Sequence, residues 1–441
     1  MKIHPPYRFL QRSVFGKKGT KSSPPWEGGR GGLRRIGLLL FLIGTITSCA
    51  SKGDHKTDYK KDTVDSVKTG AAILLQNHLN ELQGKRVGLV MNPTARVDGT
   101  HMLDTLLARD VNVTALFAPE HGFRGDFGAG ETITDGVDQA TGLPVYSLYG
   151  RTKKPTPEML EQVDILLFDM QDVGARFYTY NVTLGFILEA AARAEIPVWV
   201  LDRPNPAGGD YAAGWMLEEQ YQSFVGAYPI PMAHGMTLGE LVQMMIGERW
   251  LQTVNQPQLK VIPMQGWRRS MKWPDTGLPW IAPSPNLPTF AHAYMYLGTV
   301  LFEGTTISEG RGTPDPFLTI GSPQTELTDK QIIELKNQFP AVQVERITFT
   351  PKSMAGKALN PKYEGQMCYG VTLSITDYQS FNPVKFGVAL LELMLKNTKS
   401  AKMDDFIYKL AGSEAVKQFD TNWQSSVEQF KEAREPYLLY D

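Results

Sequence analysis

The chain has 441 residues, which is more than a single hydrophobic core usually holds, so we expect two domains. Forty-five lysines and arginines stand against 46 aspartates and glutamates, which gives a net charge of -1. This balance excludes the strongly basic surface typical of nucleic-acid-binding proteins, and we expect no nucleic acid partner.

The N-terminal residues 1–49 have the pattern of an export signal. Two arginines precede an apolar run over residues 36–46, and the sequence ITSC follows at residues 46–49. The run is too short to span a bilayer, which needs about 20 residues, but it suits the apolar region of a signal peptide. Its end resembles a bacterial lipobox, so we expect Cys49 to be lipidated after cleavage.

A lipidated Cys49 predicts an exported protein that is anchored to a membrane without spanning it, as a periplasmic or outer-membrane-associated lipoprotein. An ordinary secretory signal with a chance cysteine is the alternative. Cys368 is the only other cysteine, so we expect no intrachain disulfide. Residues 50–69 are charged and poor in large apolar groups, which predicts a solvated tether.

Residues 70–255 alternate between short apolar runs and segments with helical spacing. The runs are rich in Val, Ile, Leu and Phe, and we predict strands at 86–92, 112–120, 164–172 and 196–206. Segments 100–110 and 183–195 have apolar residues at i, i+3 and i+4, which predicts helices. The alternation indicates βα units around a parallel sheet that is buried on both faces.

Residues 256–441 have a different pattern and are predicted to form a second, smaller α/β domain. A Pro-rich stretch with three tryptophans comes first and ends near residue 288. We then predict a helix or strand at 294–305, helices at 328–339 and 384–397, and strands at 342–351 and 369–377.

Polar side chains follow each of the four predicted strands of the first domain. In chain order they are Asn92, then Glu120 and His121, then Asp169 and Asp172, then Arg203 and Asn205. Because ligands bind beyond the carboxyl ends of parallel strands, we expect a binding site at this edge. The Gly-rich loop after Glu120, which carries Arg124 and Asp126, would need its flexibility to close on a ligand.

Three other kinds of chemistry are possible at this edge. The glycines could cradle a phosphate, but the chain lacks G-x-x-x-x-G-K-[ST], and Glu120 and Asp126 would repel phosphate. Asp169 and Asp172 could hold a divalent ion with a water, but no H-x-x-x-H spacing occurs, and we expect no metal. No G-x-S-x-G motif indicates a serine nucleophile. The remaining candidate is the chemistry of paired carboxylates, which glycoside hydrolysis commonly requires.

Several longer motifs occur in a fixed order, namely GLVMNPTA, FAPEHGFRG, LFDMQDVGARFYTY, VLDRPNPAGG, PIPMAHGMTLGELV, SPNLPT, FEGT and SEGRGT. Together they resemble the exo-β-N-acetylmuramidase family over about residues 70–441. The resemblance implies a glycosidase that releases N-acetylmuramic acid from non-reducing ends of peptidoglycan fragments in cell-wall recycling, without a cofactor. It also implies a Rossmann-like domain, a smaller second domain and an active-site cleft between them, with Glu120 as the catalytic glutamate.

The residues suggest more specific roles as hypotheses. Glu120 is the candidate general acid, because Pro119 and the end of the strand would hold it at the cleft. His121 could hydrogen-bond the acid or the sugar. Asp169 and Asp172 are candidates for the second carboxylate, unless the acetamide of the substrate is the nucleophile.

The lactyl carboxylate of N-acetylmuramic acid needs a cation, and a guanidinium is the best match. Arg176 is favoured, with Arg203 and Arg311 as alternatives. The other candidates for substrate binding are Asn92, Arg124, Tyr178, Asn181, Asn205, His234 and Glu309. Each could instead be a structural residue, and the competing function is a lipid-anchored muropeptide-binding protein without hydrolytic activity.

Overall fold

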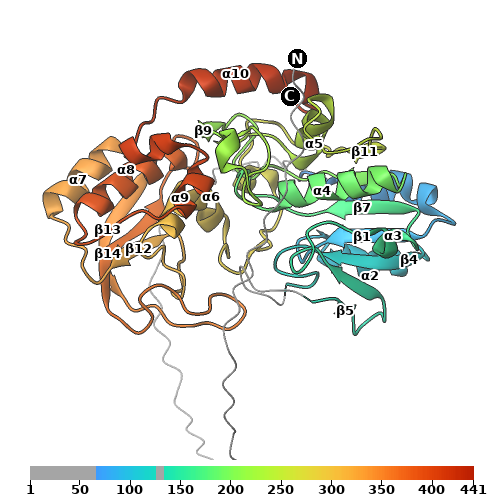
Figure 1. The fold of residues 1–441 in the computed structure, drawn as a ribbon, viewed down its shortest axis with the longest axis horizontal. Coiled ribbons are helices and arrows are strands. Elements are labelled where there is room, and N and C mark those ends of the chain that lie inside the picture. The colour runs from blue at the N-terminus through green and yellow to red at the C-terminus, as the bar shows by residue number, and fades with distance from the viewer. Residues whose placement is uncertain (1–65, 126–133) are drawn as a thin grey trace, which may run out of the picture. The chain divides into compact units, whose positions relative to one another are not determined.

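The computed structural model describes residues 66–125 and 134–441, and all of these belong to one compact unit (Figure 1). The predicted signal peptide, Cys49 and most of the predicted tether lie outside the described residues. Within the described ranges, every helix is too short or too polar to cross a membrane.

A seven-stranded sheet forms the first half of the described chain. Its strand order is β11-β8-β7-β1-β4-β6-β5, and all pairs are parallel except β5 with β6. The bounds are β1 Val87–Met91, β4 Val113–Ala118, β5 Gly136–Val137, β6 Pro144–Ser147, β7 Ile165–Asp169, β8 Val198–Leu201 and β11 Leu259–Ile262. The four predicted strands are thus confirmed as β1, β4, β7 and β8, with β1 at the centre between β4 and β7.

Helices cover both faces of this sheet, as the continuous apolar runs of its strands require. On one face Val90, Phe117 and Phe168 pack in one core with α4 (Tyr180–Arg193) and α5 (Leu238–Gly247). On the other face Leu89, Leu116 and Leu167 pack with α1 (Gly70–Ile73) and α2 (Met102–Leu107). Alternate residues of each strand therefore enter opposite cores, and the carboxyl edge of the sheet is left for polar side chains.

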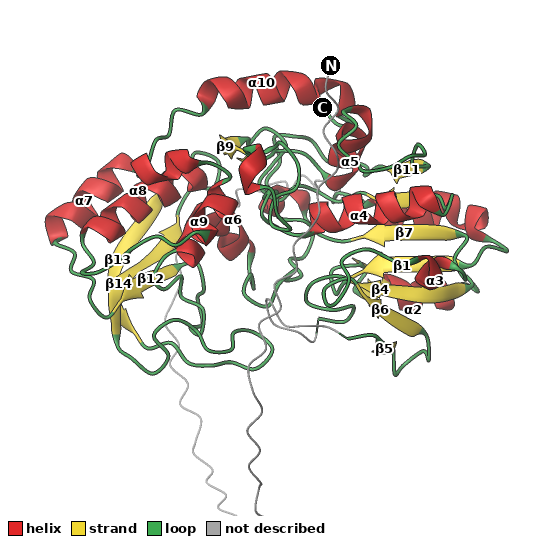
Figure 2. Cartoon of the chain, in the orientation of Figure 1, coloured by secondary structure: helices red, strands yellow, loops and turns green. Residues whose placement is uncertain are grey.

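The second half contains a three-stranded antiparallel sheet in the order β12-β14-β13 (Figure 2). The bounds of its strands and helices are β12 Thr319–Ser322, β13 Val342–Phe349, β14 Cys368–Ile375, α6 Phe290–Thr299, α7 Asp329–Gln338 and α8 Pro383–Lys396. Segment 294–305, predicted as helix or strand, is the end of α6 followed by a 3-10 turn at Val300–Gly304.

Helices α6 and α8 approach closely because glycines face each other at their crossing. A Cβ atom added to Gly298 would lie 2.0 Å from the carbonyl oxygen of Pro383, and one added to Gly387 would lie 2.4 Å from the carbonyl carbon of Gly298. The apolar core around α6 and α8 is continuous with the core above the large sheet. The predicted boundary between residues 255 and 256 stays a prediction.

The remaining described elements are short or lie at the C-terminus. They are β2 Arg96–Val97, β3 Thr100–His101, α3 Pro157–Leu160, β9 Ala213–Met216, β10 Pro231–Ala233, α9 Phe406–Ala411 and α10 Gln424–Arg434, with π or 3-10 turns at Leu74–His78, Leu79–Leu82, Glu219–Tyr221, Trp273–Thr276, Glu414–Gln418 and Glu435–Tyr437.

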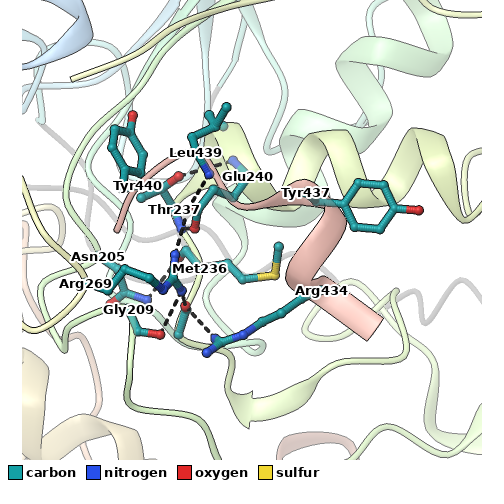
Figure 3. A network of polar contacts seen from close by, with 12 residues as sticks. Asn205, Gly209, Met236, Thr237, Glu240, Arg269, Arg434, Tyr437, Leu439 and Tyr440 are labelled. Carbon is teal, nitrogen blue, oxygen red and sulfur yellow. Dashed lines mark hydrogen bonds and ion pairs between the residues drawn. The ribbon is translucent and has the colours of Figure 1, made fainter. Parts of the chain in front are cut away.

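The residues after α10 contact the segments that follow β8, and Figure 3 shows Leu439 beside Glu240 and Arg269. The Tyr440 hydroxyl donates to Oδ2 of Asp202 at 2.6 Å, directly after β8, and the Leu439 amide donates to Oε1 of Glu240 at 3.0 Å. Arg269 forms an ion pair with the same Glu240 oxygen at 2.7 Å. Burial raises the pKa of Asp202 to about 6, although three hydrogen bonds to the carboxylate act in the opposite direction.

Candidate active site

A cavity of about 380 Å³ lies beyond the carboxyl edge of the large sheet. Residues from both halves of the described chain line it, and the charged ones are Glu120, Glu303, Glu309, Arg311, Lys357 and Lys362. Several aromatic side chains complete the wall, including Tyr149, Phe177, Tyr178, Tyr296 and Phe317. The cavity thus combines carboxylates and cations with apolar faces, which suits a polar ligand with ring-shaped apolar surfaces.

Glu120 reaches the cavity from the turn that follows β4. The Gly122 amide donates to the Pro119 carbonyl at 3.0 Å, and His121 has the left-handed φ of 72°, so the chain reverses directly after the strand. The hydroxyl of Thr179 donates to Oε2 of Glu120 at 2.8 Å. The turn and this hydrogen bond together fix the carboxyl group at the cavity wall.

Two further groups set the electrostatic surroundings of Glu120. Burial raises the pKa of the Tyr149 hydroxyl, and the nearby charge of Glu120 raises it further. The Lys153 ammonium lies 3.5 Å from the ring centre of Tyr149 and 4.5 Å from that of Phe224. Burial lowers the pKa of Lys153, and Glu120 opposes that effect. Glu120 therefore lies beside a neutral phenol and within the field of a lysine.

Four charged residues form a compact cluster on the opposite wall. Arg311 donates from Nη2 and Nε to the same Glu303 oxygen at 2.6 and 2.8 Å, and Nε lies 3.7 Å from Glu309. Lys362 donates to the other oxygen of Glu309 at 2.9 Å. Burial raises the pKa of Glu303, even with the guanidinium beside it. Burial alone would lower the pKa of Arg311, but the two carboxylates outweigh it and raise that pKa.

The structure brings five of the predicted site residues to the cavity wall, namely Glu120, His121, Tyr178, Glu309 and Arg311. Cys49 lies outside the described residues. The other predicted residues do not line the cavity, and their contacts are with the protein itself.

Asp169 and Asp172, the candidates for the second carboxylate, are both buried with protein partners. Arg203 donates from Nε and Nη2 to the two oxygens of Asp169 at 2.5 and 3.0 Å. Oδ2 of Asp172 accepts from the Gly174 amide at 2.7 Å and lies 3.5 Å from Nε2 of His234. The first pair joins the ends of β7 and β8, and the second fixes the turn after β7.

Arg176, the favoured ligand for the lactyl group, has no exposed surface. Its guanidinium donates to three backbone carbonyls, those of Trp215 at 2.7 Å, Ile230 at 2.9 Å and Leu410 at 2.9 Å. Burial lowers the pKa of Arg176 to about 9, so the guanidinium is still charged at neutral pH. Its contacts connect β9, the residue before β10, and α9. Arg176 does not line the cavity, although its partner Leu410 does.

The remaining predicted residues hold the backbone near the sheet edge. Asn92 donates to the hydroxyl of Tyr180 at 2.7 Å, and Asn181 donates to three carbonyls of the turn before α4. Asn205 donates to the carbonyl of Met236 at 3.0 Å and packs against Gly174, where an added Cβ would lie 2.4 Å from its Oδ1. Arg124 is paired with Asp138 at 2.6 Å.

Two family models match the chain. The model described as the N-terminal part of exo-beta-N-acetylmuramidase NamZ matches residues 87–291, and the one described as its C-terminal part matches residues 294–440. The chain belongs to the exo-β-N-acetylmuramidase family. The expected family resemblance is thereby confirmed across both halves of the described chain.

Relatives and solved structures agree with membership of the exo-β-N-acetylmuramidase family. The chain is 41% identical over 423 residues to the peptidoglycan beta-N-acetylmuramidase NamZ of Bacillus subtilis (strain 168), covering 92% of this chain and 98% of that protein. Crystal structures of two DUF1343 family proteins from Bacteroides fragilis NCTC 9343 are similar, with TM-scores of 0.73 and 0.70 at 32% and 35% identity. Each match covers 85% of this chain and 99% of the solved chain.

Some cavity residues of this exo-β-N-acetylmuramidase family member were missed by the sequence reasoning. Tyr149 follows β6, a strand that was not predicted, and Thr179 lies unnoticed between two tyrosines of a recognised motif. Lys357 and Lys362 come from the long connection between β13 and β14, residues 350–367. The length of that connection was a usable signal, because loops longer than about 12 to 15 residues are often functional.

Proposed function

We propose that this protein is an exo-acting glycoside hydrolase that releases N-acetylmuramic acid from non-reducing ends of peptidoglycan fragments during cell-wall turnover and recycling. The observation that carries the proposal is Glu120, held by Thr179 on the wall of a cavity that also contains Glu303 and Glu309. Family membership and the 41% identical Bacillus subtilis protein, named as a peptidoglycan beta-N-acetylmuramidase, support the substrate class.

Glu120 is the proposed general acid. Its protonated carboxyl would deliver a proton to the glycosidic oxygen as the bond to the anomeric carbon breaks. The hydrogen bond from Thr179 to Oε2 orients the carboxyl plane, which preserves the proton-transfer geometry without a rearrangement.

The second catalytic group is proposed to act from the far wall or from the substrate itself. Glu303 and Glu309 line the cavity, whereas Asp169 and Asp172 do not, so we favour the first two as cavity carboxylates. The acetamide of N-acetylmuramic acid is the other available nucleophile. Replacing Glu303 and, separately, Glu309 by Gln separates these routes, because a substrate-assisted reaction should keep most of its rate in both variants.

The proposed activity is tested by incubating the protein with a disaccharide that has N-acetylmuramic acid at its non-reducing end. Chromatography should show free N-acetylmuramic acid accumulating over many turnovers. Tight binding of the disaccharide without release of the sugar would refute hydrolysis and favour the muropeptide-binding alternative.

Glu120→Gln tests the acid directly. The amide keeps the shape of the side chain but cannot deliver a proton, so substrate binding should survive while kcat falls by about 10² to 10⁴. The loss should be smaller on an aryl muramide, because an aryl leaving group needs little protonation. Glu345→Gln is the matched control, since Glu345 is exposed on β13 and does not line the cavity. Near-normal turnover of the disaccharide by Glu120→Gln would exclude the role.

Export and lipidation at Cys49 are part of the same proposal. Support comes from the sequence alone, in the apolar run at residues 36–46 that ends at Cys49. Peptidoglycan lies outside the cytoplasmic membrane, so a lipid anchor would keep the cavity near its substrate.

A further inference from the structure

The lactyl ether is the one group that distinguishes N-acetylmuramic acid from N-acetylglucosamine, and its carboxylate needs a cationic partner. This inference rests on the proposed function, because it concerns the substrate of the same cavity. Three cations line the cavity among the described residues, namely Arg311, Lys357 and Lys362. Arg176 and Arg203 do not line the cavity, because backbone carbonyls hold the first guanidinium and Asp169 holds the second.

Two of the three cations are already neutralised. Arg311 makes two hydrogen bonds to Glu303 and lies near Glu309, so its charge is matched within the cluster. The ammonium of Lys362 lies 2.9 Å from Glu309 and contacts the carbonyl oxygens of Phe302, Glu303 and Ile307 at 2.7, 3.3 and 3.2 Å. The three ammonium protons of Lys362 are thus shared among four acceptors, and an additional acceptor from a ligand would have to displace one of these four oxygens.

Lys357 differs from both of these cations. Its side chain is exposed, and its ammonium makes no hydrogen bond or ion pair with any residue that the structure describes. Because the cluster carries two carboxylates and two cations, its charges cancel. Lys357 is therefore the positive charge on the cavity wall that remains available to an anionic ligand.

The backbone of Lys357 is fixed even though its side chain is exposed. Met354 and Ala358 exchange hydrogen bonds of 2.8 and 2.9 Å across a tight turn that contains Gly356, with a φ of 70°. The buried amide of Asn286 donates to the Lys357 carbonyl at 2.8 Å. The lysine thus projects from a turn that is docked against the SPNLPT motif.

The ends of the connection 350–367 are held as well. The Lys352 amide donates to the carbonyl of Gly312 at 2.9 Å, next to Arg311, and Lys362 is anchored beside Glu309. A Cβ atom on Gly312 would lie 2.7 Å from the Lys352 carbonyl oxygen, so glycine permits this contact. The turn with Lys357 is therefore attached to the same wall that carries the charged cluster.

We propose that Lys357 binds the lactyl carboxylate of the muramyl residue and so sets the preference for muramides over glucosaminides. The turn positions the charge, and the neutral cluster prevents Arg311 and Lys362 from competing for the same carboxylate. Leu359, two residues further on, lines the cavity and is 57% exposed, which offers an apolar contact beside the charge.

The first test measures binding of free N-acetylmuramic acid and N-acetylglucosamine by calorimetry. The unmodified protein should prefer the muramyl sugar, and Lys357→Met should bind it about tenfold more weakly while its affinity for N-acetylglucosamine stays unchanged. Lys357→Arg should restore most of the preference. Lys352→Met is the matched control, because it removes an exposed lysine from the same connection without altering the cavity wall. Retained preference in Lys357→Met would overturn the proposal.

The second test compares an aryl β-muramide with its lactyl methyl ester. Lys357→Met should raise KM for the acid about tenfold, with little change in kcat, and should leave the ester unaffected. Equal losses on both substrates would overturn the proposal and indicate a structural role for the turn. If the unmodified protein hydrolyses neither substrate, the proposed function fails, while the binding measurement still decides the role of Lys357.

Discussion

Arg176→Met should destabilise the protein without changing its preference between muramides and glucosaminides. The substitution removes three hydrogen bonds, to the carbonyls of Trp215, Ile230 and Leu410 at 2.7 to 2.9 Å. The Ile230 carbonyl keeps a second donor, the Leu217 amide at 3.3 Å, so two of the three acceptors lose their side-chain donor without this replacement. Each buried acceptor left without a donor costs about 1 to 3 kcal/mol. Part of this cost is offset, because the substitution also removes a guanidinium that is buried without a carboxylate partner, and burying such a charge itself costs free energy.

We therefore expect the free energy of unfolding to fall by about 2 to 4 kcal/mol, in the lower half of the summed penalties for two such acceptors. The compact unit Asp62–Asp441 has an unfolding entropy of about 0.8 kcal/mol/K, from ~2.1 cal/mol/K per residue. The melting temperature should thus fall by about 3 to 5 °C. Arg193→Met is the control, because Arg193 is exposed on α4 and donates to a single carbonyl at 3.1 Å.

Thermal unfolding followed by circular dichroism measures the stability, and initial rates on paired aryl glycosides measure the preference. Well below the melting temperature, the ratio of the two rates should equal that of the unmodified protein. An unchanged melting temperature together with a selective loss of muramide hydrolysis would refute the reasoning and make Arg176 a substrate ligand.

Two further predictions concern the sheet edge and the N-terminus. Burial raises the pKa of Asp202 in the folded state to about 6, above the value of about 4 in the unfolded chain. The contribution of Asp202 to the free energy of unfolding is therefore fully present below pH ~4 and is lost as the pH rises through ~6. At 1.36 kcal/mol per pH unit the loss is about 3 kcal/mol, and urea unfolding at pH 4, 5, 6 and 7 should show Asp202→Asn with a flatter profile than the unmodified protein; parallel profiles would contradict this. For the N-terminus, Cys49→Ser should move the protein from the membrane fraction to the soluble fraction after a salt wash, with unchanged activity per molecule, and continued sedimentation with membranes would contradict lipidation at Cys49.

The apolar runs of the sequence were enough to predict the centre of the large sheet. Strands buried on both faces read as continuous Val, Ile and Leu, and β1, β4, β7 and β8 all have this pattern. The edge strand β11 and the strand β6, which is next to the short edge strand β5, were missed, because three of the four residues in each are only partly buried and their apolar signal is weak. Local periodicity therefore predicts the buried strands better than the rim of a sheet.

The site was harder to predict, because the partners of charged residues lie far away in the chain. Asp169 and Arg203 both follow strands, which made them candidates, but they pair with each other across 34 positions. Arg176 contacts a carbonyl 234 positions later, and no local pattern indicates that contact. Glu120 was identifiable because its position depends on a local turn after β4.

The same long separations govern the order in which the fold can be completed during synthesis. Asp202 lies at the end of β8, and Tyr440, which donates to it, is 238 positions later. At about 5 to 20 residues per second, a ribosome needs roughly 10 to 50 s to make the intervening chain. Until then the carboxyl edge of the sheet lacks Arg434 and Tyr440, so its contacts with these two residues form only after both have been made.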